Sequence, residues 1–254
     1  MILFVLMAGH NKWSKIKRKK GVLDAKRSKI FSRIIKEITV AVKEGGSGDP
    51  EFNPRLRLAV ANAKGANMPK DNVERAIKKA LDSDTADLLQ PTYEGYAPGG
   101  VAVFVECTTD NLNRTVSSVR AVFTKYEGNL ATSGSVDFMF SRKGIFIIDR
   151  SLIQDMSEFE LEVIDAGAEE MDIDEENNEI TVTVAFEDFG SMQSKLEELG
   201  IEVKNAVLER IPDTFVNLSK EDAEKAIKLI DALEENDDVQ NVFANFEISD
   251  EIMT

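Results

Sequence analysis

Apolar positions in the first part of the chain recur at the spacing of α-helices. In residues 24–45 they fall every three or four positions, and this period predicts a helix that ends at Gly45–Gly46. Its apolar stripe consists of Ile30, Phe31, Ile34, Ile35, Ile38 and Val42. Polar and basic side chains occupy the other faces, so we expect the helix to pack by one side only.

Two further helices are predicted before residue 82. Asn53 is a favourable cap and Pro54 a favourable first helical residue, so this pair predicts a helix start. The "KGANMP" stretch, residues 64–69, ends that helix and precedes a third one. Asp71 and Glu74 have the spacing of a capping box, so Asp71 is expected to cap the third helix. The packing positions are Leu56, Val60 and Ala63 in the second helix, and Val73, Ile77 and Leu81 in the third.

The pattern becomes mixed after residue 90. Residues 100–107, "GVAVFVEC", are rich in β-branched side chains and predict a strand. Thr109–Asn111 offers cap oxygens and predicts the start of a helix over residues 112–126. Residues 135–140 and 144–149 predict two strands on either side of "SRKG".

From residue 144 to residue 209 the predicted order is strand, helix, strand, strand, helix, strand. This β-α-β-β-α-β order is typical of ferredoxin-like domains. An amphipathic helix over residues 218–236 and a strand over residues 238–248 follow these six elements and do not belong to the ferredoxin-like unit. We expect these two elements to complete the earlier strand and helix, so that the ferredoxin-like unit is an insertion.

The predicted fold class is therefore α+β, with a basic three-helix N-terminal domain and two α/β domains, one inserted in the other. The expected boundaries are residues 1–23 for a basic arm, 24–82 for the helical domain, 91–141 with 212–250 for the discontinuous domain, and 142–211 for the insertion.

Charge divides the chain into two parts. Residues 1–80 contain 19 Lys and Arg against 7 Asp and Glu, a net formal charge of +12, whereas the remainder carries −27 and the whole chain −15. Such asymmetry suggests a polyanion-binding segment attached to an acidic body. The alternative is that charge separation serves only solubility or the docking of the arm on the body.

The basic arm contains the densest group of candidate nucleic-acid contacts, Lys12, Lys15, Lys17, Arg18, Lys19 and Lys20. A cationic segment without apolar periodicity can follow a phosphate backbone, and the alternative is a solvated tail. Trp13, the only tryptophan, either stacks on an exposed base or anchors the arm on the helical domain. The first predicted helix extends this surface with Lys26, Arg27, Lys29 and Arg33.

A turn between two predicted helices is another candidate contact. "KGANMPKDN" places Lys64, Asn67 and Lys70 around this turn, where the N-terminal amides of the next helix favour an anion. The alternative is a tight turn shaped only by Gly65 and Pro69.

The "TTDNLNRT" segment supplies a second possible contact, formed by Thr109, Asn111, Arg114 and Thr115. Arg114 and Thr115 are placed to reach a phosphate. Asp110 has the wrong charge for that role, so the favoured interpretation is a polar network that fixes the strand-to-helix turn.

Site chemistry for catalysis or metal binding is not apparent. One cysteine, Cys107, and one histidine, His10, are too few for the usual zinc sites. Phosphate-loop, dinucleotide-binding, serine-hydrolase and zinc-protease motifs do not occur. The acidic "MDIDEENNE" stretch lacks the glycine and spacing of an EF-hand. We therefore expect no catalytic residue, no metal and no cofactor.

The apolar start, "MILFVLM", has no basic region before it and is too short for a signal peptide or a membrane span. We expect a cytoplasmic protein without membrane association. We also expect the first six residues to be a start-site extension, and the choice between Met1 and Met7 stays open.

Several long segments resemble the YebC/PmpR family. They are "MAGHNKWSKIKRKKG", "AKRSKIFSRIIKEI", "NPRLRLAVANAKGANMPKDNVERAIKKA", "YEGYAPGGVAVFVECTTDNLNRTVSSVR" and "GSVDFMFSRKG". The resemblance begins at Met7 and covers the rest of the chain. It implies a helical N-terminal domain and two α/β domains, the third inserted in the second. It also implies a cytoplasmic DNA-binding regulator of transcription, although close relatives act in translation and the mitochondrial relative is a translational activator.

The expected function is that of a nucleic-acid-binding regulator of gene expression. The family's usual description favours DNA and transcription, and the alternative is a translation factor that binds ribosomal RNA or the ribosome and relieves stalling. An irregular basic arm with one tryptophan suits folded RNA at least as well as a duplex, and no helix-turn-helix signature is evident. An enzyme is a distant third class. The target sequence, the oligomeric state and the role of the acidic insertion stay open.

Overall fold

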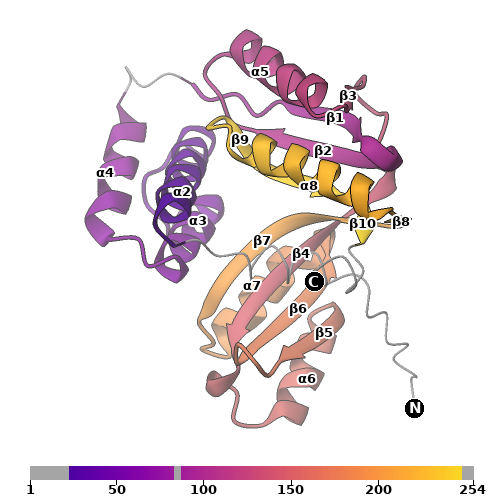
Figure 1. Cartoon of the computed structure of the whole chain (residues 1–254). Helices are drawn as coiled ribbons and strands as arrows, with labels where there is room; N and C mark the ends of the chain where they lie inside the picture. The colour runs from indigo at the N-terminus through magenta and orange to yellow at the C-terminus, as the bar shows by residue number, and fades with distance from the viewer. Residues whose placement is uncertain (1–22, 83–86, 248–254) are drawn as a thin grey trace. The chain divides into compact units, whose positions relative to one another are not determined.

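The computed structural model of the chain describes residues 23–82 and 87–247, with side chains from residue 28 to residue 246. The described elements divide into two compact units, one of residues 88–141 and 211–247 and the other of residues 30–82 and 142–210. In the described residues three helices come first and are followed by strands and helices that form two four-stranded sheets and one two-stranded sheet (Figure 1), so the predicted α+β class is confirmed. The predicted domain boundaries stay a prediction.

The described residues 23–82 form three helices, namely α2 (Leu23–Gly45), α3 (Pro54–Gly65) and α4 (Lys70–Leu81). Their apolar faces meet in one core, which contains Ile38, Ala41, Val42, Leu56, Ala59, Ala63, Met68, Val73, Ala76 and Ala80. The predicted packing positions of α3 are confirmed for Leu56 and Ala63. Val60 is only partly buried against this core.

Asn53 joins the end of α2 to the start of α3. Its side-chain oxygen accepts the backbone N–H of Leu56 at 3.0 Å, as the predicted cap requires. Its amide nitrogen donates to the carbonyl oxygens of Ala41 at 2.7 Å and Ser47 at 3.1 Å. Because Asn53 is buried, one side chain both caps α3 and fixes the loop that follows α2.

Part of the predicted α2 stripe is wrong. Ile30 is 45% exposed and Ile35 37% exposed, whereas Val40 and Ala41 are buried. Phe31 and Ile34 of the same stretch are partly buried against the core, so Ile30 and Ile35 lie at the edges of the stripe and not beyond the reach of the neighbouring helices. The fully buried positions of α2 begin at Ile38, in its C-terminal half.

The start and end of α4 also differ from the prediction. The helix begins at Lys70 with Pro69 in the cap position, and no side chain caps it. Asp71 lies inside the first turn, so the predicted capping box does not form, because the rigid Pro69 sets the helix start two residues earlier. Leu81 is 56% exposed because it is the last residue of the helix, beyond the buried Ala80.

The first sheet has the strand order β3-β1-β2-β9. Its strands are β1 (Thr92–Ala97), β2 (Val101–Cys107), β3 (Asn129–Leu130) and β9 (Val239–Ala244), and the turn η1 (Pro98–Gly100) joins β1 to β2. Helices α5 (Leu112–Lys125) and α8 (Lys220–Glu234) lie along one face (Figure 1).

The strand β1 is an element that the sequence pattern does not predict, because Tyr93–Gly99 carries the Gly and Pro of a turn-like sequence. It nevertheless pairs along its whole length with β2, from Thr92 with Glu106 to Ala97 with Val101.

The second face of this sheet is covered by a loop rather than by a strand. Residues 137–139 form a short helical turn, η2, and the buried Val136 and Phe140 pack on Ala102 and Phe104. The strand predicted over residues 135–140 is therefore wrong, whereas the one predicted over residues 144–149 is present but begins earlier, because β4 (Phe140–Asp149) runs through "SRKG". Gly144 does not break the strand, because it pairs with Val184 of the neighbouring strand, and a side chain at this position would collide with Phe189 and Val184.

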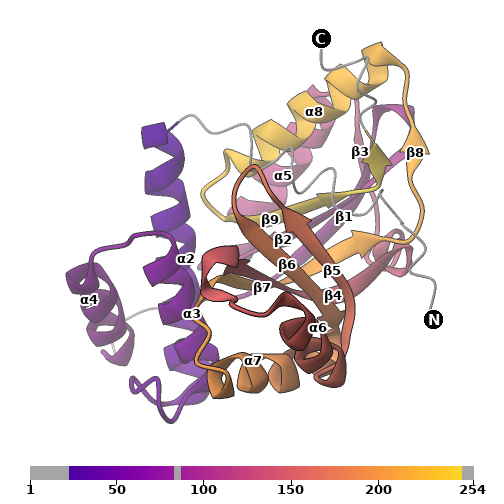
Figure 2. The same ribbon diagram turned by 90° about the horizontal axis from the view of Figure 1, so that it is seen from below.

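The insertion has the predicted β-α-β-β-α-β order. After β4 come α6 (Met156–Asp165), β5 (Ala168–Asp174), β6 (Glu179–Ala185), α7 (Phe189–Glu198) and β7 (Val203–Pro212), with the turns η3 (Arg150–Leu152) and η4 (Phe186–Asp188). The strand order β5-β6-β4-β7 is that of a ferredoxin-like sheet, with α6 and α7 on one face (Figure 2). Its core contains Phe146, Ile148, Phe159, Val163, Ile180, Val182, Val184, Met192, Leu196 and Ala206.

After the insertion the chain returns to the first unit. A short strand β8 (Val216–Asn217) pairs in parallel with β10 (Phe246–Glu247), and α8 and β9 lie between them in sequence. The four strands of the first sheet therefore come from both sides of the insertion, as the sequence pattern predicts.

Candidate nucleic-acid interface

Most of the predicted arm contacts lie outside the described residues. These are Lys12, Trp13, Lys15, Lys17, Arg18, Lys19 and Lys20. Lys26 and Arg27 belong to the backbone of α2, but their side chains also lie outside the described part. Lys29 and Arg33 are partly exposed on α2, next to the exposed Ile30. The role of all these residues in binding stays a prediction.

The structure brings Lys64, Asn67 and Lys70 together at the α3–α4 turn, where all three are exposed. Three backbone hydrogen bonds close the turn, from Ala66 to Asn62, from Asn67 to Lys64 and from Met68 to Ala63, each at 2.9 Å. Asn67 has a φ of 56°, a left-handed conformation that asparagine tolerates better than most residues. The turn between α3 and α4 is thus four residues long, the length found in helix-turn-helix units.

The two lysines at this turn have acidic neighbours. Lys64 Nζ lies 2.5 Å from Glu202 of the insertion, and Lys70 Nζ lies 3.4 Å from Glu74 one helical turn later. All four side chains are largely exposed to solvent. Exposed ion pairs of this kind contribute little to stability, so an incoming phosphate can compete for either lysine.

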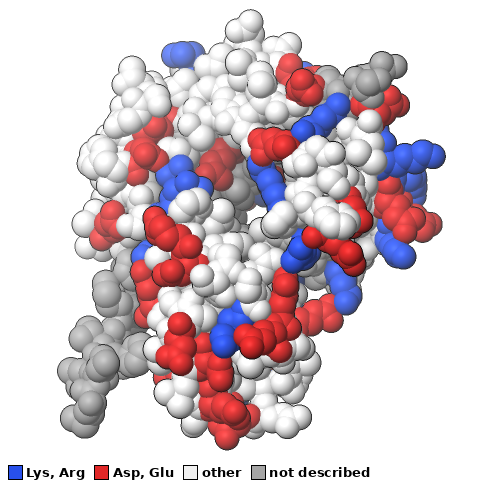
Figure 3. Space-filling model, turned by 180° about the vertical axis from the view of Figure 1, so that it is seen from behind, with Lys and Arg blue, Asp and Glu red and all other residues white. Residues whose placement is uncertain are grey.

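The solvent face of α4 adds three cations that are not among the predicted contacts, Arg75, Lys78 and Lys79. They lie opposite the buried Val73 and Ala76. Arg75 is oriented by its own helix, since it donates to the carbonyl oxygen of Asp71 at 3.1 Å and to Asn72 at 2.9 Å. The helical period of the apolar positions could have identified this face. Basic side chains gather at the right-hand edge of the surface in Figure 3, interleaved with acidic ones.

The helix α3 also contacts the insertion. Asn62 pairs with the backbone of Ala206 on β7, accepting its N–H at 2.9 Å and donating to its carbonyl oxygen at 2.8 Å. A Cβ atom on Gly65 would lie 1.7 Å from the carbonyl oxygen of Lys204, so only glycine permits this approach. Arg57 of α3 lies 3.6 Å from Glu197 of α7. The acidic insertion is therefore held directly beside the candidate contact Lys64.

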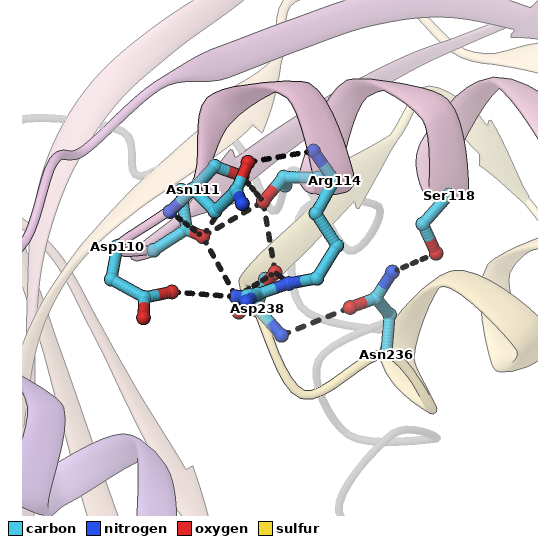
Figure 4. A network of polar contacts seen from close by, with 8 residues as sticks. Asp110, Asn111, Arg114, Ser118, Asn236 and Asp238 are labelled. Carbon is cyan, nitrogen blue, oxygen red and sulfur yellow. Dashed lines mark hydrogen bonds and ion pairs between the residues drawn. The ribbon is translucent and has the colours of Figure 1, made fainter.

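The second candidate contact forms one hydrogen-bonded network (Figure 4). Asn111 caps α5, because its side-chain oxygen accepts the backbone N–H of Arg114 at 3.0 Å. The buried hydroxyl of Thr115 lies 2.9 Å from the Thr109 hydroxyl and 2.8 Å from Asp238. The loop before β9, which contains Asp238, is therefore hydrogen-bonded to the start of α5.

Arg114 completes the network from the solvent side. Its guanidinium group donates to both oxygens of Asp238 at 3.0 Å and to Asp110 at 2.7 Å. The hydrogen bonds that Arg114 donates to Asp110 and Asp238 raise the pKa of Arg114 above its ordinary value. The four candidate residues are thus hydrogen-bonded within the protein, which supports the structural alternative, and their contact with phosphate stays a prediction.

The acidic side chains of the described part do not form a metal site. In residues 28–82 and 87–246, His, Cys, Asp and Glu do not gather in groups of three or more that could hold a metal ion. Cys107 is buried in the core of the first sheet. Among the helices of residues 23–82 and 87–247, none is long and apolar enough to cross a membrane.

Comparison with known proteins gives a consistent family assignment. Residues 11–83 match the model of the TACO1/YebC protein N-terminal domain, and residues 88–246 match that of the TACO1/YebC second and third domain. A relative from Amoebophilus asiaticus, named "Probable transcriptional regulatory protein", is 52% identical over 239 residues, covering 94% of this chain and 98% of the relative. A relative of the same name from Geotalea uraniireducens is 53% identical over 248 residues, covering 97% and 98%.

A solved structure shows the same fold. The crystal structure of the conserved hypothetical protein Aq1575 from Aquifex aeolicus matches with a TM-score of 0.79 and 46% sequence identity. The match covers 91% of this chain and 94% of that one.

Proposed function

The chain belongs to the TACO1/YebC family, and from this membership we propose that it is a DNA-binding regulator of transcription. The names of its relatives support a regulatory role, since they are called probable transcriptional regulatory proteins. We place the protein in the cytoplasm, with nucleic acid as its partner and with no catalytic activity.

One structural observation carries the proposal most directly. The exposed face of α4 and the turn before it present the cations Lys64, Lys70, Arg75, Lys78 and Lys79. The α3–α4 turn has the length of a helix-turn-helix connection, in which the second helix approaches a duplex. The Lys- and Arg-rich arm precedes this surface in sequence and adds further cations for phosphate contacts.

The test changes the charge of α4 in the full-length chain. Replacing Lys70, Arg75, Lys78 and Lys79 with Gln should weaken binding to a DNA duplex. It should also flatten the dependence of log K on log salt by up to about 0.9 for each phosphate that is no longer bound. The matched control replaces Arg120, Lys125, Lys220 and Lys228, exposed cations of α5 and α8, and changes the net charge equally. An equal loss of affinity in both variants would mean that only net charge matters and would remove α4 from the interface.

A translation factor that binds RNA or the ribosome is the second candidate. The single Trp13 among the arm cations favours it, because an aromatic ring stacks better on an unpaired base than on a closed duplex. The same salt series with a hairpin RNA separates the two functions. Tight, α4-dependent binding to the hairpin with little binding to DNA would replace the transcriptional proposal with the translational one.

A further inference from the structure

A loop in the first unit presents an exposed aromatic ring. Phe138 is 74% exposed, although its neighbours Val136 and Phe140 are buried under the first sheet. A single exposed apolar side chain is common on protein surfaces, so the exposure of Phe138 needs a second observation, which is the way the backbone of its loop is held.

The loop is held by a buried carboxylate. Glu94 of β1, only 3% exposed, accepts the backbone N–H groups of Gly134, Val136 and Asp137 at 2.7, 2.6 and 3.0 Å. Hydrogen bonds from several amides to one carboxylate are charge-assisted and stronger than neutral ones. Three amides of the loop are therefore tied to one side chain in the sheet.

Further contacts fix both ends of the loop. The Tyr96 hydroxyl donates to the carbonyl oxygen of Ser135 at 3.1 Å, and Ala131 donates to the Glu94 carbonyl oxygen at 2.8 Å. On the other side, the N–H of Asp213 donates to the Met139 carbonyl oxygen at 3.0 Å. The position of the loop that carries Phe138 is thus set before any partner binds, which lowers the entropic cost of using it in an interface.

The charge around the loop indicates the kind of partner. Asp137 and Asp213 are exposed near Phe138, one beside it in sequence and the other hydrogen-bonded to the next residue, Met139. Residues 88–141 and 211–246 together contain 14 Asp and Glu against 6 Lys and Arg. A phosphate backbone is repelled by such a surface, whereas a basic protein surface is attracted to it.

We propose that Phe138 is the anchor of a protein-binding site, inserted into an apolar pocket whose rim on the partner protein is basic. Glu94 acts as the positioning residue of this site, because it holds the loop without being exposed itself. This surface is distinct from the basic face of α4 and does not depend on the proposed nucleic-acid function.

The experiment uses a photoreactive benzoylphenylalanine in place of Phe138 in the full-length chain, expressed in its own cell type. The matched control carries the same group in place of Phe52, which is 78% exposed in the helical part. We expect one discrete protein crosslink from position 138 that is missing from position 52. A crosslink to nucleic acid, a crosslinked pair of copies of this chain, or the same products from both positions would overturn the proposal.

The crosslinked protein, once purified, supplies the quantitative test. Phe138→Ala should weaken its binding at least about tenfold, as expected for a buried aromatic anchor. Phe52→Ala should leave the affinity unchanged, and Asp137→Asn with Asp213→Asn should reduce the dependence of the association rate on salt. Glu94→Gln should weaken binding while Phe138 remains present. Unchanged affinity in Phe138→Ala would show that the ring is not the anchor.

Discussion

The side-chain amide of Asn62 forms a two-hydrogen-bond pair with the backbone of Ala206, at 2.8 and 2.9 Å. The strand β7 is at the end of its sheet, so its outer N–H and C=O groups have no neighbouring strand in the described part of the chain. One asparagine on α3 thus satisfies edge groups that otherwise need a further strand or water. The helical part and the insertion are therefore coupled by a backbone-specific contact, not only by charge.

This coupling depends on close approach at Gly65. We expect Gly65→Ala to destabilise the protein by about 1–3 kcal/mol, because the added methyl group overlaps the Lys204 carbonyl oxygen. Hydrogen exchange of the Ala206 amide should become faster at the same time. The control is Gly190→Ala in α7, where nothing lies within 4 Å and a gain of about 0.5–1 kcal/mol is expected. Similar effects at both glycines would contradict the coupling.

Asn53 should be more important than an ordinary helix cap. Asn53→Ala removes the cap on α3 and leaves the buried Ala41 carbonyl oxygen without its donor, so we expect a loss of roughly 2–4 kcal/mol. Asn111→Ala, at the exposed cap of α5, should cost only about 1 kcal/mol. Urea unfolding of the two variants measures the difference, and equal losses would show that the bond to Ala41 contributes nothing.

The contacts of Asp149 should make the stability of the protein depend on pH in the acid range. Hydrogen bonds from the side chain and backbone of Ser151, and the nearby Lys204, lower the pKa of Asp149 from 3.8 to about 2. A pKa lowered by folding stabilises the protein above the unfolded value, and this stabilisation is lost as the pH falls through the folded value. The difference in unfolding midpoint between wild type and Asp149→Asn should thus be constant above about pH 4 and shrink between about pH 4 and pH 2. A constant difference down to pH 2 would exclude this assignment.

The arm can be separated into charge and stacking contributions. Replacing Lys15, Lys17, Arg18, Lys19 and Lys20 with Gln should weaken binding to all nucleic-acid sequences about equally and flatten the salt dependence. Trp13→Ala should leave the salt dependence nearly unchanged and cost about 1–3 kcal/mol on a looped RNA, with little effect on duplex DNA. Equal losses on both ligands with a lower melting temperature would make Trp13 a structural anchor. An unchanged salt dependence in the five-cation variant would remove the arm from the interface.

The periodic parts of the fold are predictable from the sequence, since helices α3, α5 and α8 and the order of the insertion follow directly from caps and apolar spacing. The prediction is wrong where contacts between elements, and not the local sequence, determine which residues are buried and which segments form strands. Ile30 and Ile35 have the spacing of a core stripe, but only their neighbours Phe31 and Ile34 pack against the core of the three helices. The strand β1 escapes prediction because its burial comes from β2 and not from its own composition.

The neighbours of the candidate site residues are also only partly predictable from the sequence. Lys64, Asn67 and Lys70 can be recognised as neighbours because they flank one turn. The acidic neighbour Glu202 cannot, since nearly 140 positions of chain separate it from Lys64. Likewise Arg114 is recognisable as a possible phosphate ligand, but only the structure shows that Asp238, 124 positions later, already accepts its hydrogen bonds.

The place of β9 in the first sheet has a consequence for synthesis of the protein. Glu106 on β2 and Asn241 on β9 are hydrogen-bonded at 3.1 Å although they are 135 positions apart. During translation β2 is made early and pairs with β1, but its other edge stays open until the last strand of that sheet has left the ribosome. A chain that stops before residue 239 therefore keeps an apolar strand edge that can pair with other chains. For this fold, the outer edge of β2 is protected only after β9 has been made.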